Sequence, residues 1–243
     1  MGGHPVQSLK SPAMSHSVPI HLRPTAPLAE RVLLPGDPGR ALALAQSLLL
    51  EPLMFNHHRG LWGYTGTAPD GEPLTIQSTG MGGPSAAIVL SELIALGVGR
   101  AIRVGSCGAL APGLALGDLV IAREAISGDG TSRALGGGEL LAADPQLTRA
   151  LIREAPAARA GAIVSVDLFY EARMPPGADR ALAVEMEAAA LFAVGGAAGV
   201  PVACLLAVSD TFDSSGARER IGDDALLAAA ETMGAAAIAA LSA

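Results

Sequence analysis

Two arginines stand where a positive charge is unfavourable unless an anion is bound nearby. Arg103 lies inside the apolar run 101–104, and burying an unpaired guanidinium costs several kcal/mol. Arg40 falls in the first turn of an expected helix, where a cation opposes the helix dipole by about a few tenths of a kcal/mol. A bound anion would reverse both effects. Two alternatives without a bound anion stay open: a surface Arg40 paired with Asp37, and an Arg103 that faces solvent from a strand end.

Glycine-rich turns beside both arginines suit an oxyanion. Gly36 precedes Asp37 and Pro38, which favour the N-terminus of a helix, where free N–H groups bind anions. Residues 105–108, Gly-Ser-Cys-Gly, follow Arg103 and are expected to form a turn that offers N–H groups and a hydroxyl. The sequence therefore predicts an anion pocket built from separate segments.

Two other motifs are weaker. Residues 56–60, Asn-His-His-Arg-Gly, form a cationic cluster whose spacing does not match a zinc site, so we expect no metal. Residues 80–83, Gly-Met-Gly-Gly, look like the start of a dinucleotide fingerprint, but its third glycine would fall at Ser85 and no acidic residue stands at the expected distance. A nicotinamide-dependent dehydrogenase is therefore a poor interpretation.

Three acidic residues in the second half could serve catalysis or binding. Glu185 and Glu187 lie at the start of an expected helix over 184–198, where a two-residue spacing points them to opposite faces. A buried glutamate needs hydrogen-bond donors, and a sugar diol is one candidate. Asp210 follows an expected strand over 202–208 and is either a catalytic acid or a turn residue.

The elements that must position these residues alternate between short apolar runs and helical stretches. This alternation favours a single α/β domain with three layers (α/β/α) around a mixed, largely parallel sheet. In such folds ligands bind at the carboxyl ends of the strands. The expected strands are 32–34, 74–78, 101–104, 119–123, 162–166 and 202–208, and the expected helices are 40–50, 85–96, 184–198 and 223–241.

Composition bounds the class of protein. The 243 residues are 50% hydrophobic and 16% charged, which excludes disorder for most of the chain, and the net charge of -7 argues against nucleic acid and anionic membranes as partners. Two cysteines, Cys107 and Cys204, indicate a reduced, cytoplasmic protein. The most continuous apolar stretch, 200–208, is too short to span a membrane. We expect residues 1–19 to be a disordered extension and residues 20–243 to form the domain.

Five segments in order resemble the nucleoside phosphorylase-I family, which includes purine nucleoside phosphorylases, uridine phosphorylases and related nucleosidases. The likeness is strongest to the bacterial hexameric purine nucleoside phosphorylases. The segments are 32–40, 80–85, 102–108, 184–188 and 208–210.

The resemblance implies a role for each matching position. Asp210 matches the general acid. The phosphate-binding positions are Gly36, Arg40, Arg59, Arg103 and Ser106. The ribose-binding positions are His21, Met81, Met186 and Glu187, and the base-binding positions are Cys107, Gly108, Phe169, Glu185 and Ser209. His21 and Arg59 resemble residues that serve the site of a neighbouring subunit, and either Arg218 or Arg220 could assist Asp210.

The expected activity is phosphorolysis of purine nucleosides with inorganic phosphate as co-substrate and no cofactor, in a homohexamer built as three dimers. Uridine or methylthioadenosine phosphorolysis, a hydrolytic nucleosidase and a catalytically silent nucleoside-binding protein are the alternatives. The Gln-x-Arg pattern of uridine phosphorylases is absent after Phe169, where residues 171–173 are Glu-Ala-Arg.

Overall fold

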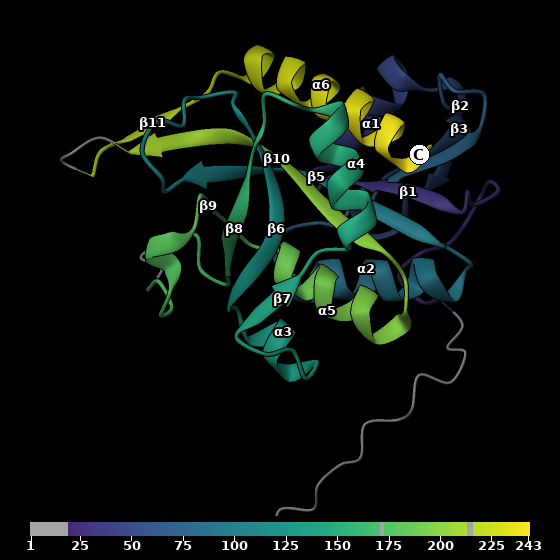
Figure 1. Ribbon diagram of the computed structural model, residues 1–243. Coiled ribbons are helices and arrows are strands. Elements are labelled where there is room, and N and C mark those ends of the chain that lie inside the picture. Colours follow the sequence, from purple (N-terminus) through teal and green to yellow (C-terminus); the bar gives the residue numbers. More distant parts are fainter. Residues whose placement is uncertain (1–18, 171–172, 213–215) are drawn as a thin grey trace, which may run out of the picture.

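The computed structural model describes residues 19–170, 173–212 and 216–243 (Figure 1). The predicted disordered extension, residues 1–19, lies outside the described residues apart from Pro19.

The N-terminal half begins with a strand and a capped helix. Asp37 caps the helix by accepting a hydrogen bond from the Arg40 backbone N–H at 2.6 Å, and Pro38 is the first helical residue, as predicted. In order, the elements are β1 (Arg31–Leu34), α1 (Pro38–Leu48), β2 (Leu50–Asn56), the short 3-10 helix η1 (His58–Gly60), β3 (Gly63–Thr67), β4 (Pro73–Gln77) and α2 (Gly83–Ala95).

The C-terminal half carries the longest strands, which are almost entirely buried. Its elements are β5 (Arg100–Ala109), β6 (Leu119–Gly128), α3 (Gly130–Ala134), β7 (Leu140–Ala142), α4 (Pro145–Glu154), β8 (Arg159–Val166), η2 (Ala178–Arg180), β9 (Ala183–Glu185), α5 (Ala188–Ala198), β10 (Val202–Phe212), β11 (Arg218–Arg220) and α6 (Asp223–Leu241).

The strands form one mixed sheet, part of which closes into a ring. Strand β10 pairs in parallel with β5 and antiparallel with β6, while β6, β8, β9 and β5 follow one another in the sheet. The α/β class with a mixed sheet is thus confirmed, and the ring is a feature that the sequence pattern did not predict. The parallel register of β5 and β10 sets Asp210 opposite Gly108, at the carboxyl ends of both strands.

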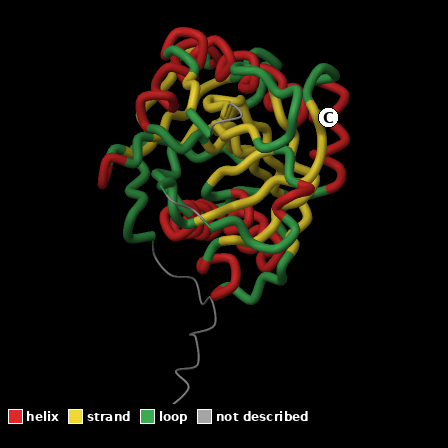
Figure 2. Tube along the Cα trace, turned by 90° about the vertical axis from the view of Figure 1, so that its left-hand side faces the viewer, coloured by secondary structure: helices red, strands yellow, loops and turns green. Residues whose placement is uncertain are grey.

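Helices cover the sheet on both faces (Figures 1 and 2). Helices α1, α4 and α6 pack on one face, and α2, α3 and α5 on the other, over two large apolar clusters. Among the described helices only α6 is long and apolar enough to cross a membrane, and it is longer than the stretch that the sequence singled out. Here α6 buries Met233 and Leu241 against the sheet, as a core helix does.

Several predicted boundaries were wrong for one physical reason. Residues 105–108, expected to form a turn, are part of β5, and Asp210, expected to follow a strand that ends at residue 208, is part of β10. Cross-strand pairing extends both strands past their apolar runs. The helix expected from residue 184 begins at Ala188, because residues 183–185 pair with β5 and β8 as strand β9. The helix expected over 40–50 ends at Leu48, and β2 (Leu50–Asn56) follows in a stretch where no strand was predicted.

Candidate functional site

A buried arginine held by two glutamates forms the centre of the candidate site. Arg103, on β5, is 3% exposed, and its Nη2 lies 2.5 Å from Glu187 Oε2. Its Nε lies 2.9 Å from Glu185 Oε2, without the alignment of a hydrogen bond. Burial alone would lower the pKa of Arg103, but Glu187 and Glu185 outweigh burial and raise it. The remaining nitrogen, Nη1, is buried and has no hydrogen-bond partner among the described residues.

A glycine two residues further along β5 makes room for this guanidinium. A Cβ atom built on Gly105 would lie 2.7 Å from Arg103 Cζ, closer than real Cβ contacts allow. Side chains two apart on a strand share one face, so a larger residue at 105 would push Arg103 away from the glutamates. Gly105 is therefore part of the site, although its sequence position indicated only a turn.

Both glutamates face Arg103, which corrects the expectation that they point to opposite faces of a helix. They precede helix α5 instead of lying inside it. Glu185 accepts hydrogen bonds from the Ser165 hydroxyl and from the backbone N–H groups of Glu187 and Ala188, which are free at the helix start. Burial raises the pKa of Glu185.

Two turns from distant parts of the sequence meet beside Glu187. The Gly80 N–H donates to Gly36 O at 3.0 Å, and the Gly82 N–H donates to Glu187 Oε1 at 2.5 Å. Gly80 and Gly82 both have left-handed backbone conformations, with φ of 73° and 87°, which favour glycine. Met81, between them, is 87% exposed. The turns after β1 and β4 thus come together as predicted for neighbouring parallel strands.

Arg40 lies close enough to Arg103 for their positive charges to interact. Burial lowers the pKa of Arg40, Asp37 opposes that effect, and the positive charges of Arg103 and Arg220 lower it further. The Arg40 guanidinium forms no ion pair with any carboxylate in the described part of the chain. The guanidinium groups of Arg103 and Arg220 therefore lie close enough to disfavour the charge of Arg40, and a bound anion would offset this effect.

Asp210 lies next to this group on β10 and is 4% exposed. The Ser209 hydroxyl donates to Asp210 Oδ2 at 2.6 Å. On the other oxygen, Oδ1, Arg220 Nη1 donates at 3.4 Å and Arg218 Nε lies at 3.8 Å. Strand β11 brings both arginines there, because Arg220 is the antiparallel partner of Asp210.

Four of the five predicted base-side residues lie near Asp210, and the fifth, Glu185, contacts Arg103 instead. Ser209 Oγ also lies 3.2 Å from Cys107 O, and Gly108 is the register partner of Asp210. Phe169 reaches the same place through Arg218, whose Cζ lies 4.4 Å from the Phe169 ring centroid. Burial raises the pKa of the Cys107 thiol, which disfavours the thiolate form that a nucleophile needs.

His21 and Arg59 stand apart from the rest. His21 Nδ1 lies 2.7 Å from Glu92 Oε1 on α2, and Arg59 is exposed, with a left-handed φ of 58° that is uncommon outside glycine. Within residues 19–170, 173–212 and 216–243, no hydrogen bond or ion pair joins either side chain to Arg103 or Asp210. The remaining predicted positions, Ser106 and Met186, are half-buried beside Cys107 and between the two glutamates.

Two further polar residues support the site and were missed in the sequence. Ser165 is a lone hydroxyl in the apolar run 162–166, and it also accepts from the Ala189 N–H at 3.0 Å. Glu92 is an acid on the apolar face of α2. Such isolated polar residues in apolar patterns are a usable signal, although the pattern does not say which partner they bind. In the described chain no group of three or more His, Cys, Asp or Glu side chains is arranged to hold a metal ion.

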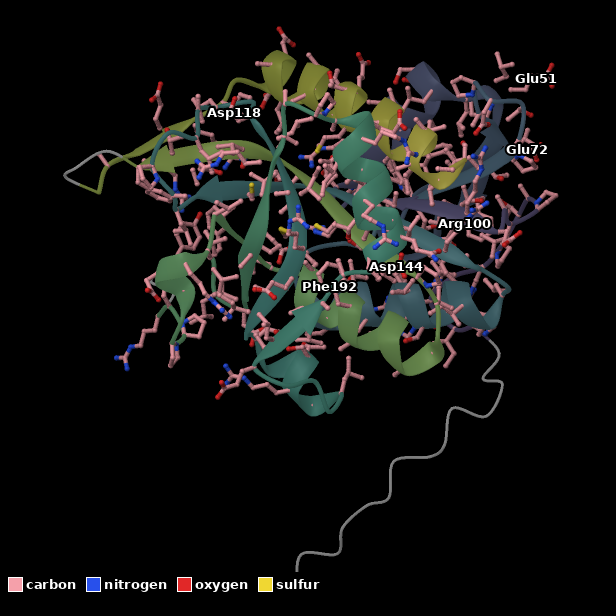
Figure 3. All side chains as sticks on the ribbon, in the orientation of Figure 1. Glu51, Glu72, Arg100, Asp118, Asp144 and Phe192 are labelled. Atoms are coloured by element: carbon pink, nitrogen blue, oxygen red, sulfur yellow. The ribbon has the colours of Figure 1, made fainter. Side chains whose placement is uncertain are left out.

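A separate cavity of about 540 Å³ lies at the opposite end of the strands. Arg100 and Glu72 line it at the amino ends of β5 and β4. In Figure 3 these two residues lie far from Asp118, whose backbone oxygen accepts from Val208 N–H near the carboxyl end of β10. None of the predicted site residues lines this cavity.

Comparisons with known proteins identify relatives of this chain. Residues 30–242 match the model of the phosphorylase superfamily. A DeoD-type purine nucleoside phosphorylase of Geobacillus kaustophilus is 38% identical over 209 residues, which cover 81% of this chain and 88% of that protein. A uridine phosphorylase of Thermococcus kodakarensis is 36% identical over 219 residues, which cover 79% of this chain and 78% of that protein.

A solved structure supports the fold. The crystal structure of uridine phosphorylase from Vibrio fischeri superposes with a TM-score of 0.75 at 24% identity, covering 88% of this chain and 92% of that one. The match over residues 30–242 and the relatives that align along most of their length lead to one conclusion: the chain belongs to the phosphorylase superfamily, among the nucleoside phosphorylases.

Proposed function

We propose that this protein is a purine nucleoside phosphorylase that catalyses reversible phosphorolysis of purine ribonucleosides and deoxyribonucleosides to the free base and the pentose 1-phosphate. The observation that carries the proposal is the buried Arg103, which contacts Glu185 and Glu187 and whose Nη1 has no hydrogen-bond partner among the described residues. A buried guanidinium donor without an acceptor is unfavourable by about 1–3 kcal/mol, and a phosphate oxygen would satisfy it.

The phosphate is the nucleophile. Arg40 and Arg103 bind its oxygens, and the N-terminus of α1 with the Gly36 backbone adds oriented N–H groups. Ser106 donates its hydroxyl, and Arg59 reaches the phosphate of a neighbouring subunit. The Arg40, Arg103 and Arg220 charges favour a dianion at this place.

The sugar lies between the phosphate and the base. Glu187 accepts hydrogen bonds from the ribose hydroxyls, and Met81 and Met186 contact the ring. As the glycosidic bond breaks, positive charge develops on the sugar, and the bound phosphate stabilises it. His21 of a neighbouring subunit binds the 5′ oxygen.

The base leaves toward Asp210. A protonated Asp210 donates to purine N7 as the bond to the sugar breaks, so that the base does not depart as an anion. Cys107, Gly108, Phe169, Glu185 and Ser209 surround the base. Asp210 is positioned for this role by the Ser209 hydroxyl and by the β5–β10 register.

The wider setting of the enzyme is part of the proposal. Residues 20–243 act as one phosphorylase domain with a three-layer α/β/α arrangement, in a homohexamer of three dimers that exchange His21 and Arg59. The reaction uses inorganic phosphate and no cofactor, and we assign the protein to the cytoplasm. Its part in metabolism is purine salvage.

Uridine phosphorolysis is the second candidate, because relatives with both names align along most of this chain. The presence of Asp210 at the base side favours purines, since proton donation to N7 has no counterpart in uracil. A substrate panel with inosine, guanosine, adenosine, uridine and methylthioadenosine separates these possibilities.

The deciding experiment measures phosphate-dependent release of hypoxanthine from inosine. We expect release that requires phosphate and yields ribose 1-phosphate. Equal release without phosphate would indicate a nucleosidase, uridine as the sole substrate would indicate a uridine phosphorylase, and binding of inosine without turnover would indicate a silent binding protein.

A further inference from the structure

Arg218 occupies the base side of the candidate site. Its Cζ lies 4.4 Å from the ring centroid of Phe169 and 5.5 Å from that of Phe212, so the two rings hold the guanidinium by cation–π contacts. Its Nε lies 3.8 Å from Asp210 Oδ1. The side chain is 34% exposed, so a ligand beside Phe169 can reach its remaining N–H groups.

The two arginines of β11 take different places. Arg220 donates to Asp210 at 3.4 Å, and its charge lowers the pKa of Arg40, so Arg220 lies near both residues. Arg218 contacts the aromatic rings instead. Both belong to one face of the strand, because alternate residues share a face. Arg220 therefore forms the shorter contact with Asp210, while Arg218, 3.8 Å from the same oxygen and packed on the two rings, has its remaining N–H groups on the base side.

Resting on the proposed function, we infer that Arg218 is a specificity-determining residue that donates to the oxygen at C6 of the purine and thereby selects 6-oxopurines over 6-aminopurines. A guanidinium has only donors. A 6-oxopurine presents two acceptors, N7 and O6, whereas adenine presents the N7 acceptor and an amino donor. With Asp210 at N7, Arg218 meets an acceptor in the first case and a donor in the second.

Asp210 does not offset this preference. An amino group at C6 would need an acceptor, but Asp210 Oδ2 already accepts from Ser209 and Oδ1 accepts from Arg220. In the proposed mechanism Asp210 gives its proton to N7, and the donor groups of Ser209 and Arg220 already face its two oxygens, so a C6 amino group would meet further donors there. The donors around Asp210 thus favour a base edge that carries acceptors alone.

The test compares kcat/KM for inosine and adenosine in the wild type and in Arg218→Met. Methionine keeps an apolar contact with the two rings but has no donor. We expect the wild type to prefer inosine by about tenfold or more, and Arg218→Met to lose most of that preference through a lower kcat/KM for inosine. Purine riboside, which has hydrogen at C6, should be cleaved equally by both proteins.

Two more variants guard against a folding artefact. Arg218→Lys keeps a donor and should retain part of the preference for inosine. Arg153→Met removes an exposed arginine of α4 that pairs with Glu154 far from the site, and it should leave the ratio unchanged. A ratio that Arg218→Met does not alter, or a wild type that prefers adenosine, would overturn the assignment.

Binding of the free bases separates this inference from the proposed function. Calorimetry with hypoxanthine and adenine needs no turnover. Tighter binding of hypoxanthine that is lost in Arg218→Met supports the role of Arg218 even in a protein without phosphorylase activity. Equal binding of both bases refutes that role even in an active phosphorylase, and activity on uridine alone refutes both proposals.

Discussion

Arg103 Nη2 lies 2.5 Å from Glu187 Oε2, so the residue that we assign to phosphate and the residue that we assign to ribose form one ion pair. The proposed phosphate site and the proposed ribose site are therefore joined by this ion pair. If phosphate binds Arg103 as proposed, the ion pair between Arg103 and Glu187 weakens, and the carboxylate of Glu187 becomes a better acceptor for the sugar hydroxyls. The pair links the two substrates through a single buried contact.

Arg103→Met should both destabilise the fold and weaken phosphate binding. Removing one partner of a buried ion pair typically costs about 3–5 kcal/mol, because the carboxylates of Glu185 and Glu187 stay buried without compensation. Denaturant unfolding measures the loss, and the KM for phosphate should rise by at least about tenfold. The double variant Arg103→Met/Glu187→Gln removes one of the unpaired charges and should recover part of the stability but not the phosphate affinity. An unchanged KM for phosphate would contradict the assignment.

Gly105→Ala should displace the guanidinium of Arg103 without replacing any charged residue. The added methyl would lie 2.7 Å from Arg103 Cζ, so the guanidinium must move. Overpacking of this kind costs about 1–3 kcal/mol, and we expect the KM for phosphate to rise several-fold. Gly138→Ala is the matched control, because a Cβ atom there meets nothing within 4 Å. If both variants had wild-type kinetics, the contact of Gly105 with Arg103 would have no functional weight.

Asp210→Asn should slow the cleavage of inosine without changing the KM for phosphate. An amide cannot give up a proton to N7, and general acid catalysis contributes about 10²–10⁴-fold to the rate. A nucleoside methylated at N7, such as 7-methylguanosine, already carries the positive charge that protonation would supply. We therefore expect Asp210→Asn to cleave it at a rate close to that of the wild type. Equal losses on both nucleosides would show that Asp210 has a different role.

Local chemistry made part of this fold predictable. Asp37 and Pro38 are residue types that favour the start of a helix, and α1 begins there. Helix α6 was predicted over 223–241 and has these ends, because its run of helix-forming apolar residues is continuous. The ring of strands was not predictable in this way. It depends on pairings such as Val184 with both Gly108 and Val164, which lie far away in the sequence.

The site shows the same division. A charge inside an apolar run made Arg103 a candidate, since such a residue needs a partner. Its partners did not follow from spacing, because Glu185 and Glu187 were expected on a helix and stand instead on a strand end and a helix cap. Arg218 contacts Phe169 because β11 folds back on β10. A strand of three residues, 218–220, is too short for its pairing to be predicted from the sequence pattern.

The contact of Glu92 with His21 makes a pH-dependent prediction. Glu92 accepts hydrogen bonds from the backbone N–H groups of residues 20–22 and lies 2.7 Å from His21 Nδ1. Burial raises the pKa of Glu92, but the hydrogen bonds from His21 and its neighbours outweigh burial, and the net effect lowers the pKa from 4.5. A carboxyl whose pKa is lower in the folded state stabilises the fold above its unfolded pKa, and this stabilisation is lost as the pH falls through the folded pKa.

Glu92→Gln should therefore reduce the free energy of unfolding by about 1–3 kcal/mol at pH 7, with a difference from the wild type that shrinks as the pH falls below about 4. Glu231→Gln, an exposed substitution on α6, is the control and should have no effect at either pH. The KM for inosine should also rise in Glu92→Gln, since Glu92 fixes the His21 ring that we assign to the 5′ oxygen of a neighbouring subunit's substrate. A loss of stability that is the same at pH 7 and pH 3 would mean that the charge of Glu92 does not matter, because only an ionised carboxylate gives the difference a pH dependence.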